Sequence, residues 1–476
     1  MAVQKKTIFP KTPTGINGLD EITNGGFPKG RPVLICGSAG CGKTLFAMQF
    51  LVKGITEHNE PGVFMSFEES SSDLSQNVKS LGFDLEELKA KKKLRVDQVR
   101  IERSEIEETG EYDLEALFIR LNYAIDSIGA KRVVLDTIES LFAGMNNMAI
   151  LRSEIRRLFQ WLKEKGVTAI ITGERGEATL TRQGLEEYVS DCVILLDFRV
   201  IDQIATRRLR IVKYRGSTHG TNEYPFLIDE NGISVLPVTT LKLDYKSSKE
   251  IISTGLLALD KLFSEGGVYR GSSILLTGTA GTTKTILASH FAMSSCRRKE
   301  RVLYFSFEES PDQLARNIAT IGINLKSQIK SKLLYIHASR PSLQGLEMHL
   351  LVLHKLMTEL KPRTVIIDPI SSLITIGSTS EVRGMLVRLM DTLKTNQVNA
   401  LFTSLTHNHD SQYKDATVDA VSSLADTWIN VKNENKDNGR TRSLLIVKAR
   451  GMGHYNNQQE FIITNKGIKF LNSEMK

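Results

Sequence analysis

Short apolar runs alternate with stretches of helical periodicity along the whole chain. Residues 151–164, for example, carry apolar positions three and four residues apart, which is the spacing of an amphipathic helix. Such alternation predicts βαβ units and a mainly parallel central sheet flanked by helices. The runs that we expect to form buried strands are residues 31–37, 62–67, 131–136, 167–172 and 192–197.

The pattern changes toward the end of each half of the chain. Residues 207–214 and 442–449 alternate polar and apolar positions, which is typical of a strand with one face in water. We therefore expect each parallel sheet to continue into a C-terminal antiparallel extension.

The sequence also contains an internal duplication. The segment Ser-Phe-Glu-Glu-Ser at 66–70 recurs at 306–310, and Lys-x-Arg-Gly-x-x-His at 213–219 recurs at 448–454. Landmarks that recur in one order at a nearly constant offset predict two copies of one domain. The expected domains are residues 1–240 and 241–476, with the joint near residues 237–250.

Composition narrows the class of protein without identifying it. With 476 residues, of which 41% are apolar and 24% charged, the chain is not largely disordered. The net charge of +8 suits nucleic acid, nucleotide phosphates or an acidic partner, and equally a protein with no such role. The four cysteines form no CxxC pair, which argues against a zinc knuckle and fits a reducing compartment. No apolar stretch has the ~20 residues of a membrane helix, so we expect a cytoplasmic protein with no membrane partner.

The first copy carries a complete phosphate-binding motif, G-x-x-x-x-G-K-[ST], between an apolar run and a helical stretch. Its glycines let backbone N–H groups approach phosphates, and the helix N-terminus adds partial positive charge. We expect the lysine to neutralise the terminal phosphates and the threonine hydroxyl to ligate Mg²⁺. The expected nucleotide-binding residues are Gly37, Ser38, Ala39, Gly40, Cys41, Gly42, Lys43 and Thr44.

The second copy repeats this loop with one departure, because Thr283 stands where the motif has glycine. A Cβ atom there is expected to crowd the phosphates or to strain the turn. Two interpretations stay open: a nucleotide site with weak or slow turnover, and a decayed loop that binds little. The residues concerned are Gly278, Thr279, Ala280, Gly281, Thr282, Thr283, Lys284 and Thr285.

Acidic residues follow the apolar runs in both copies. Asp136 and Asp368 each end a buried run, where an acid beside the phosphate loop suits the Mg²⁺ shell together with the loop threonine, Thr44 or Thr285. A turn aspartate is the plainer alternative, and the repetition favours the metal role.

Two pairs of glutamates follow another strand. Glu68 and Glu69 recur as Glu308 and Glu309, and carboxylates at this end of a sheet can polarise an attacking water or hydroxyl. A solvated helix start is the ordinary interpretation of one Glu-Glu pair, and repetition at the matching offset favours catalysis.

A basic segment comes late in each copy, just before a glycine turn. Lys213 and Arg215 recur as Lys448 and Arg450. Such cations are suited to reach the γ-phosphate of a neighbouring subunit. An exposed basic edge that discourages strand pairing explains them equally well.

Together these doubled motifs resemble the KaiC family of RecA-like ATPases over approximately residues 12–470. The resemblance implies an α/β fold of two tandem RecA-like P-loop domains, with ATP and Mg²⁺ as cofactors. It implies a homo-hexamer of two stacked rings with ATP between subunits, in which the first ring is a slow ATPase. The second ring would be an autokinase and autophosphatase.

The resemblance also assigns roles to residues. Glu68 and Glu69 would position the hydrolytic water, Glu308 and Glu309 would serve phosphotransfer, and the acceptor pair aligns with Ser422 and Ser423. The residues implied to contact ATP from the adjacent subunit are Lys213, Tyr214, Arg215, Ser217 and His219, then Arg442, Lys448, Ala449, Arg450 and His454.

Other functions stay open. Met452 replaces Ser217 in the second copy, and clock members carry a longer C-terminal tail for an activating partner than the nine residues that follow Gly467. A stress or signalling role therefore stands beside a clock role, with a protein partner of either type. A RecA-like DNA motor is a further alternative, although the zinc finger and dense basic runs expected for a nucleic-acid partner are missing. In the last alternative, the second ring is a non-catalytic scaffold that uses ATP for assembly.

Overall fold

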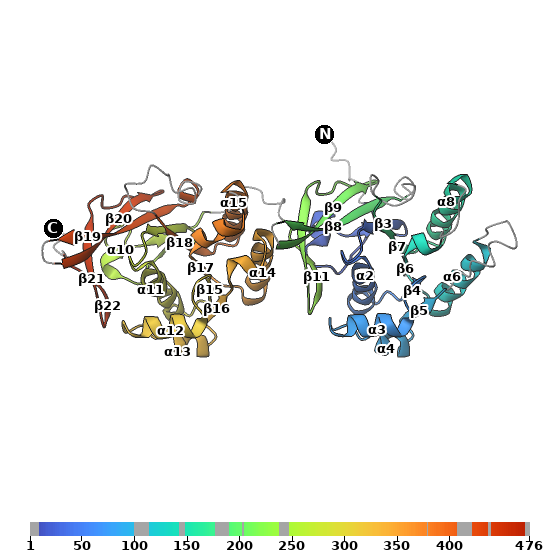
Figure 1. The fold of residues 1–476 in the computed structure, drawn as a ribbon, viewed down its shortest axis with the longest axis horizontal. Coiled ribbons are helices and arrows are strands. Elements are labelled where there is room, and N and C mark those ends of the chain that lie inside the picture. Colours follow the sequence, from blue (N-terminus) through green and yellow to red (C-terminus); the bar gives the residue numbers. More distant parts are fainter. Residues whose placement is uncertain are drawn as a thin grey trace, which may run out of the picture. The chain divides into compact units, whose positions relative to one another are not determined.

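The computed structural model divides into two compact units, Met1–Thr240 and Leu241–Lys476, each of which is described by itself (Figure 1). Most of the expected joint lies outside the described residues. None of the helices in the described parts is long and apolar enough to cross a bilayer. The structure describes residues 9–99, 114–141, 148–176, 190–201, 204–237, 247–377, 379–406, 421–436 and 439–471.

The first unit is built on a nine-stranded sheet in the order β11-β10-β9-β8-β3-β7-β6-β4-β5. In this spatial order, the six strands β8, β3, β7, β6, β4 and β5 are parallel to one another. β9, β10 and β11 extend the sheet in antiparallel pairing. A two-stranded ribbon, β1 with β2, is separate from this sheet. The strands are β1 Lys11–Thr12, β2 Phe27–Pro28, β3 Pro32–Gly37, β4 Gly62–Ser66, β5 Leu94–Gln98, β6 Arg132–Asp136, β7 Thr168–Glu174, β8 Cys192–Ile201, β9 Ile204–Tyr214, β10 Glu223–Asp229 and β11 Gly232–Val235.

Helices cover both faces of this sheet, which explains why its central strands β3, β4 and β6 are buried at every position. Val33 and Ile35 face α2, α3 and α4 in one core cluster, whereas Leu34 and Cys36 face α6 and α8 in another. The helices are α1 Leu19–Ile22, α2 Lys43–His58, α3 Ser71–Lys79, α4 Leu85–Ala90, α6 Glu115–Ile128, α7 Ile138–Leu141 and α8 Met148–Glu164.

The second unit repeats this architecture, with the sheet order β16-β15-β17-β18-β14-β19-β20-β21-β22 and a β12-β13 ribbon. In Figure 1, α11, α12 and α13 cover one side of its sheet, and α14 and α15 lie on the other. Its strands are β12 Ile251–Ile252, β13 Val268–Tyr269, β14 Ser273–Gly278, β15 Val302–Ser306, β16 Leu334–Ala338, β17 Thr364–Asp368, β18 Asn399–Leu405, β19 Thr427–Lys436, β20 Gly439–Ala449, β21 Gln459–Thr464 and β22 Gly467–Phe470. Its helices are α10 Leu257–Asp260, α11 Lys284–Arg297, α12 Pro311–Ala319, α13 Leu325–Lys330, α14 Leu346–Leu360 and α15 Thr379–Thr395, with 3₁₀ turns at Pro341–Leu343 and Ile370–Ile376.

The expected α/β fold with an antiparallel extension is confirmed in both units. Two details differ from the expectation. β8 runs for ten residues instead of about six, because it continues into a long hairpin with β9. The edge strand β5 was not expected, since only its first residue, Leu94, is fully buried and its apolar pattern is weak.

Strand direction gives each sheet two chemically different edges. We call the edge where the parallel strands end the carboxyl edge, and the edge where they begin the amino edge. β3 is parallel to β8, and β8 is antiparallel to β9, so that Val33, Cys192 and Tyr214 lie at one level near the amino edge. The phosphate loop follows Gly37 at the carboxyl edge, roughly 13 Å further along β3 at 3.3 Å per residue.

The two units pack the helix after the phosphate loop, α2 or α11, against the sheet with different residues. In the first unit the fully buried Arg132 donates to Glu60 (2.7 Å) and to the Phe50 carbonyl (2.8 Å), and a Cβ atom on Gly54 would overlap its guanidinium group. In the second unit the matching positions are Ser295 and Thr364, whose hydroxyls share a 2.9 Å hydrogen bond. In the first unit, a glycine on the helix thus leaves room for an arginine on the strand. In the second unit, a serine and a threonine occupy the same two positions.

We predict that Gly54→Ala destabilises the first unit by about 2 kcal/mol, because the added methyl group displaces the Arg132 side chain. The double change Gly54→Ser with Arg132→Thr, which installs the second unit's pair, is expected to recover most of this loss. Chemical denaturation of the full chain measures both effects, and Ser295→Ala, at about 1 kcal/mol, is the matched control. A Gly54→Ala protein as stable as the parent contradicts this packing.

Candidate functional site

The phosphate loop of the first unit connects β3 to α2 at the carboxyl edge. Gly40 and Gly42 adopt left-handed conformations, with φ of 73° and 104°, that glycine adopts without strain. The Lys43 ammonium group donates to the carbonyls of Gly37 (2.9 Å) and Ser38 (3.1 Å). The lysine is thus folded over the loop, at the place where phosphate oxygens would accept its hydrogen bonds.

The second loop has the same shape despite its substitution. Thr283 has φ of 76°, a left-handed conformation that is strained for a β-branched residue, and its hydroxyl is buried without a partner among the described residues. Lys284 donates to the carbonyls of Gly278 and Thr279, both at 2.8 Å, and burial lowers the pKa of Lys284 to about 8. The loop geometry is therefore preserved at the cost of local strain.

In the first unit the loop threonine faces the strand-end aspartate. The Thr44 hydroxyl donates to Asp136 Oδ2 at 2.8 Å, while Thr172 donates to Asp136 Oδ1. Burial raises the pKa of Asp136 above its ordinary value, against the opposing effect of these hydrogen bonds. A hydroxyl and a carboxylate of this kind are the oxygen ligands that Mg²⁺ prefers, so these residues fit that ion.

The strand-end aspartate of the second unit has a different partner. Tyr304 donates to Asp368 Oδ2 at 2.6 Å, and Thr403 donates to Asp368 Oδ1. Within the described residues, the Thr285 side chain makes no hydrogen bond to Asp368. Burial raises the pKa of Tyr304 well above its ordinary value, so the phenol remains a donor.

The glutamate pairs follow β4 and β15 at the carboxyl edge. Glu68 accepts hydrogen bonds from Thr137 (3.1 Å) and Ser140, both within four residues after Asp136 in the chain. Partial burial, helped by the Asp136 charge, raises the pKa of Glu69.

In the second unit, Ser372 donates to Glu308 at 3.3 Å and Asn317 donates to Glu309 at 2.9 Å. Each pair is held in place because the following serine, Ser70 or Ser310, caps the next helix.

The basic segment lies at the opposite edge. In the first unit Asp191 forms ion pairs with Lys163 (2.8 Å) and Arg215 (3.6 Å), which ties the segment to the amino edge. Lys11 donates to the Ser217 hydroxyl at 2.7 Å and lies 4.8 Å from the centre of the Tyr214 ring. The structure does not bring this segment near the phosphate loop of its own unit.

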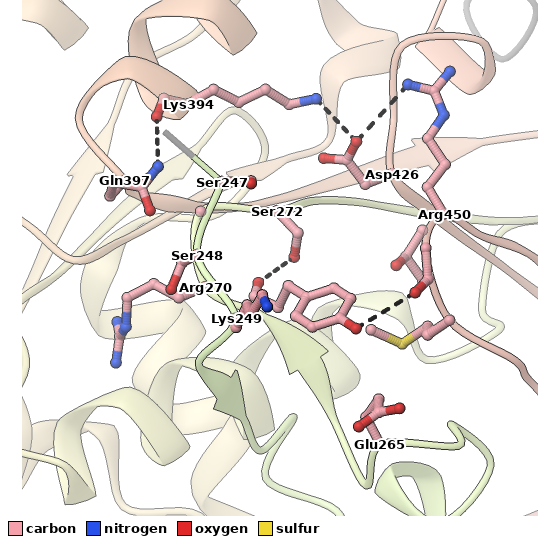
Figure 2. Close-up of a pocket in the computed structure, with 15 residues that line it drawn as sticks. Ser247, Ser248, Lys249, Glu265, Arg270, Ser272, Lys394, Gln397, Asp426 and Arg450 are labelled. Atoms are coloured by element: carbon pink, nitrogen blue, oxygen red, sulfur yellow. Dashed lines mark hydrogen bonds and ion pairs between the residues drawn. The ribbon is translucent and has the colours of Figure 1, made fainter. Parts of the chain in front are cut away.

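The second unit repeats the arrangement around Asp426, which pairs with Lys394 (2.9 Å) and Arg450 (3.8 Å). Figure 2 shows Asp426 between these two cations, where all three residues line a pocket of about 710 Å³ at the amino edge. Lys448 donates to the carbonyl of Ser422 at 2.6 Å, and Arg450 donates to that of Ser423. The candidate acceptor serines are therefore in direct contact with the basic segment of their own unit.

Three other residues that the sequence implied to contact ATP from the adjacent subunit lie apart from this contact. Arg442 on β20 pairs with Asn433 on β19, beyond the level where β14 ends. It comes six residues, roughly 20 Å of strand, before Lys448. His219 and His454 each lie in the turn after the basic segment, with Nδ1 near the carbonyl of the next residue (2.9 and 3.4 Å). Arg442 is thus on the carboxyl side of its sheet, unlike Lys448.

Several residues of these sites were not identified from the sequence. Asp191 and Asp426 stand at matching places before β8 and β19, and Lys163 and Lys394 end matching helices, so the repeat itself carries the signal. Tyr304 gives no such signal, because tyrosine in a buried strand reads as an ordinary core residue.

Comparisons with known proteins match the chain over both units. A model of the KaiC ATPase family matches residues 12–240 and again residues 252–475. The chain is 55% identical over 461 residues to the circadian clock protein KaiC2 of Synechocystis sp., covering 97% of this chain and 81% of that protein. It is 36% identical over 462 residues to the circadian clock oscillator protein KaiC of Synechococcus elongatus (96% and 88%), and 37% identical over 472 residues to that of Thermostichus vulcanus (99% and 90%).

We predict that Thr283→Gly stabilises the second unit by about 1 kcal/mol, because glycine removes the strain of the left-handed conformation. The reverse change in the first unit, Gly42→Thr, is expected to destabilise that unit, since its Cβ would also lie 3.0 Å from Ile228. Thermal unfolding of the two variants measures the effects. A less stable Thr283→Gly protein would contradict the strain at this position.

Proposed function

The chain belongs to the KaiC family of ATPases, and we propose that its two units use ATP for different reactions. The first unit hydrolyses ATP slowly. The second transfers the γ-phosphoryl group to Ser422 or Ser423 and later releases it. Both reactions take place in a homo-hexamer with ATP between neighbouring subunits, in a clock- or signalling-type system with a protein partner.

The observation that carries this proposal is the separation of each site's two halves. The phosphate loop is at the carboxyl edge of each sheet, and Lys213, Arg215, Lys448 and Arg450 are at the amino edge. A unit cannot fold its basic segment onto its own phosphates without breaking the sheet. Head-to-tail contact between copies brings one edge to the other, and a ring closes such contacts.

In the first unit the residues suit hydrolysis. Lys43 binds the terminal phosphates, and Thr44 with Asp136 would hold Mg²⁺, which neutralises phosphate charge when bound. Glu68 and Glu69 orient the attacking water, and the raised pKa of Glu69 favours its accepting a proton near neutral pH.

In the second unit the residues suit transfer to a hydroxyl. The Ser422 or Ser423 oxygen attacks the γ-phosphorus of ATP held by the neighbour, the bond to the β-phosphate oxygen breaks, and ADP leaves. Glu308 of the nucleotide-binding copy takes the hydroxyl proton, with Glu309 beside it. Lys448 and Arg450 hold the carbonyls of the two serines, which orients the acceptor segment.

One observation favours a second candidate function for the C-terminal unit. The strained Thr283 in its phosphate loop is consistent with a ring that binds ATP only for assembly. In that case the first unit is the sole ATPase and the serines stay unmodified.

Incubation with γ-labelled ATP and Mg²⁺, followed by mapping of phosphorylated residues, separates the two functions. We expect label on Ser422 or Ser423 that Glu308→Gln abolishes by removing the base. ADP release without label, lost in Lys43→Ala, instead supports the scaffold.

Mixing two inactive variants tests transfer between copies. Glu308→Gln retains its acceptor serines, whereas Ser422→Ala with Ser423→Ala retains its base. We expect label to appear on the Glu308→Gln chains only after mixing and reassembly. Label in the unmixed Glu308→Gln protein contradicts the role of Glu308 as base. No label in the mixture, while wild type is labelled, contradicts transfer between copies.

A further inference from the structure

The two strand-end aspartates differ in one hydrogen bond. Asp136 Oδ2 accepts from the loop threonine Thr44 at 2.8 Å, and Asp368 Oδ2 accepts from Tyr304 at 2.6 Å. The other oxygen of each aspartate accepts from an equivalent threonine on the next strand, Thr172 or Thr403. The two units therefore have the same hydrogen-bond donor at Oδ1 of the aspartate and different donors at Oδ2.

The divergence comes from a single position on the neighbouring strand. Phe64 on β4 pairs with Val134 on β6, and Tyr304 on β15 pairs with Ile366 on β17 at the same register. Phe64 and Tyr304 are fully buried and belong to the core clusters beneath the P-loop helix of their units. The sequence difference that matters is thus one phenolic oxygen.

We propose that Tyr304 is a positioning residue that holds Asp368 away from the loop threonine and weakens the binding of Mg²⁺ with nucleotide in the second unit. This inference rests on the proposed nucleotide site of that unit. In the first unit, Thr44 and Asp136 already face each other as ligands for the ion. In the second unit, that arrangement forms only after the Tyr304 bond is broken.

The strength of the Tyr304 bond follows from its surroundings. A hydrogen bond to a carboxylate is about twice as strong as one between neutral groups. Because Tyr304 is completely buried and Asp368 is only 8% exposed, water competes little for this bond. Asp368 has both oxygens held by hydroxyls of the sheet, so little drives it toward Thr285 until a cation arrives.

A purely structural role for Tyr304 predicts something different. If the phenol only fills the core, its loss changes stability and changes nucleotide affinity equally with and without metal. If it competes with the metal shell, its loss changes only the metal-dependent part. The dependence of binding on Mg²⁺ therefore separates the two roles.

The test is Tyr304→Phe in full-length protein that carries Lys43→Ala, so that only the second unit binds nucleotide. A fluorescent ATP analogue is titrated by anisotropy over a series of Mg²⁺ concentrations and in EDTA. We expect the half-saturating Mg²⁺ concentration to fall about three- to tenfold, with the affinity in EDTA unchanged within about twofold. The reciprocal variant, Phe64→Tyr with Lys284→Ala, is expected to raise the Mg²⁺ requirement of the first unit.

The outcomes distinguish this inference from the function on which it rests. Intact binding with an unchanged Mg²⁺ requirement in both variants overturns the role of Tyr304 and leaves the proposed nucleotide site standing. Loss of all binding in the Lys43→Ala protein, with or without Mg²⁺, overturns both. If Tyr304→Phe fails to fold, the Phe64→Tyr variant decides, since it adds an oxygen to the first unit and leaves the Tyr304–Asp368 bond in place.

Discussion

Each unit depends on the parallel pairing of its P-loop strand with the strand that precedes the antiparallel hairpin. β3 pairs with β8 and β14 pairs with β19, both in parallel. This pairing sends the phosphate loop to one edge of the sheet and returns the basic segment to the other, because the hairpin reverses the chain. A site that needs both edges is incomplete in one copy, so the chemistry proposed here follows from strand direction before any side chain is considered.

On this common frame the two units differ at a few positions. Thr283 strains the second phosphate loop, Tyr304 takes the aspartate oxygen that Thr44 holds in the first unit, and Met452 replaces the Ser217 hydroxyl that accepts from Lys11. All of these changes fall at residues that the proposed function places around nucleotide and metal, whereas the sheet order is unchanged. Local substitutions on one duplicated frame therefore account for the proposed division between a hydrolytic unit and a phosphotransfer unit.

Much of this was predictable from the sequence, and the exceptions have physical reasons. The loop from Gly37 to Thr44 is a local motif whose glycines dictate the turn, so strand, loop and helix were expected correctly. The Tyr304–Asp368 bond depends on β15 lying beside β17, a pairing that no local pattern encodes. The sequence grouped Arg442 with Lys448, and the register of β20 against β19 shows that Arg442 lies beyond the level where β14 ends, at the carboxyl edge.

The most direct test of the central claim is the molar mass of the full chain, measured by sedimentation with ATP and Mg²⁺ and again without nucleotide. We predict an assembly of six chains with ATP. The nucleotide bound at the carboxyl edge of one copy would be contacted by the basic segment at the amino edge of the next copy. A single chain under both conditions would contradict the claim that Arg215 and Arg450 act on a neighbour's phosphates.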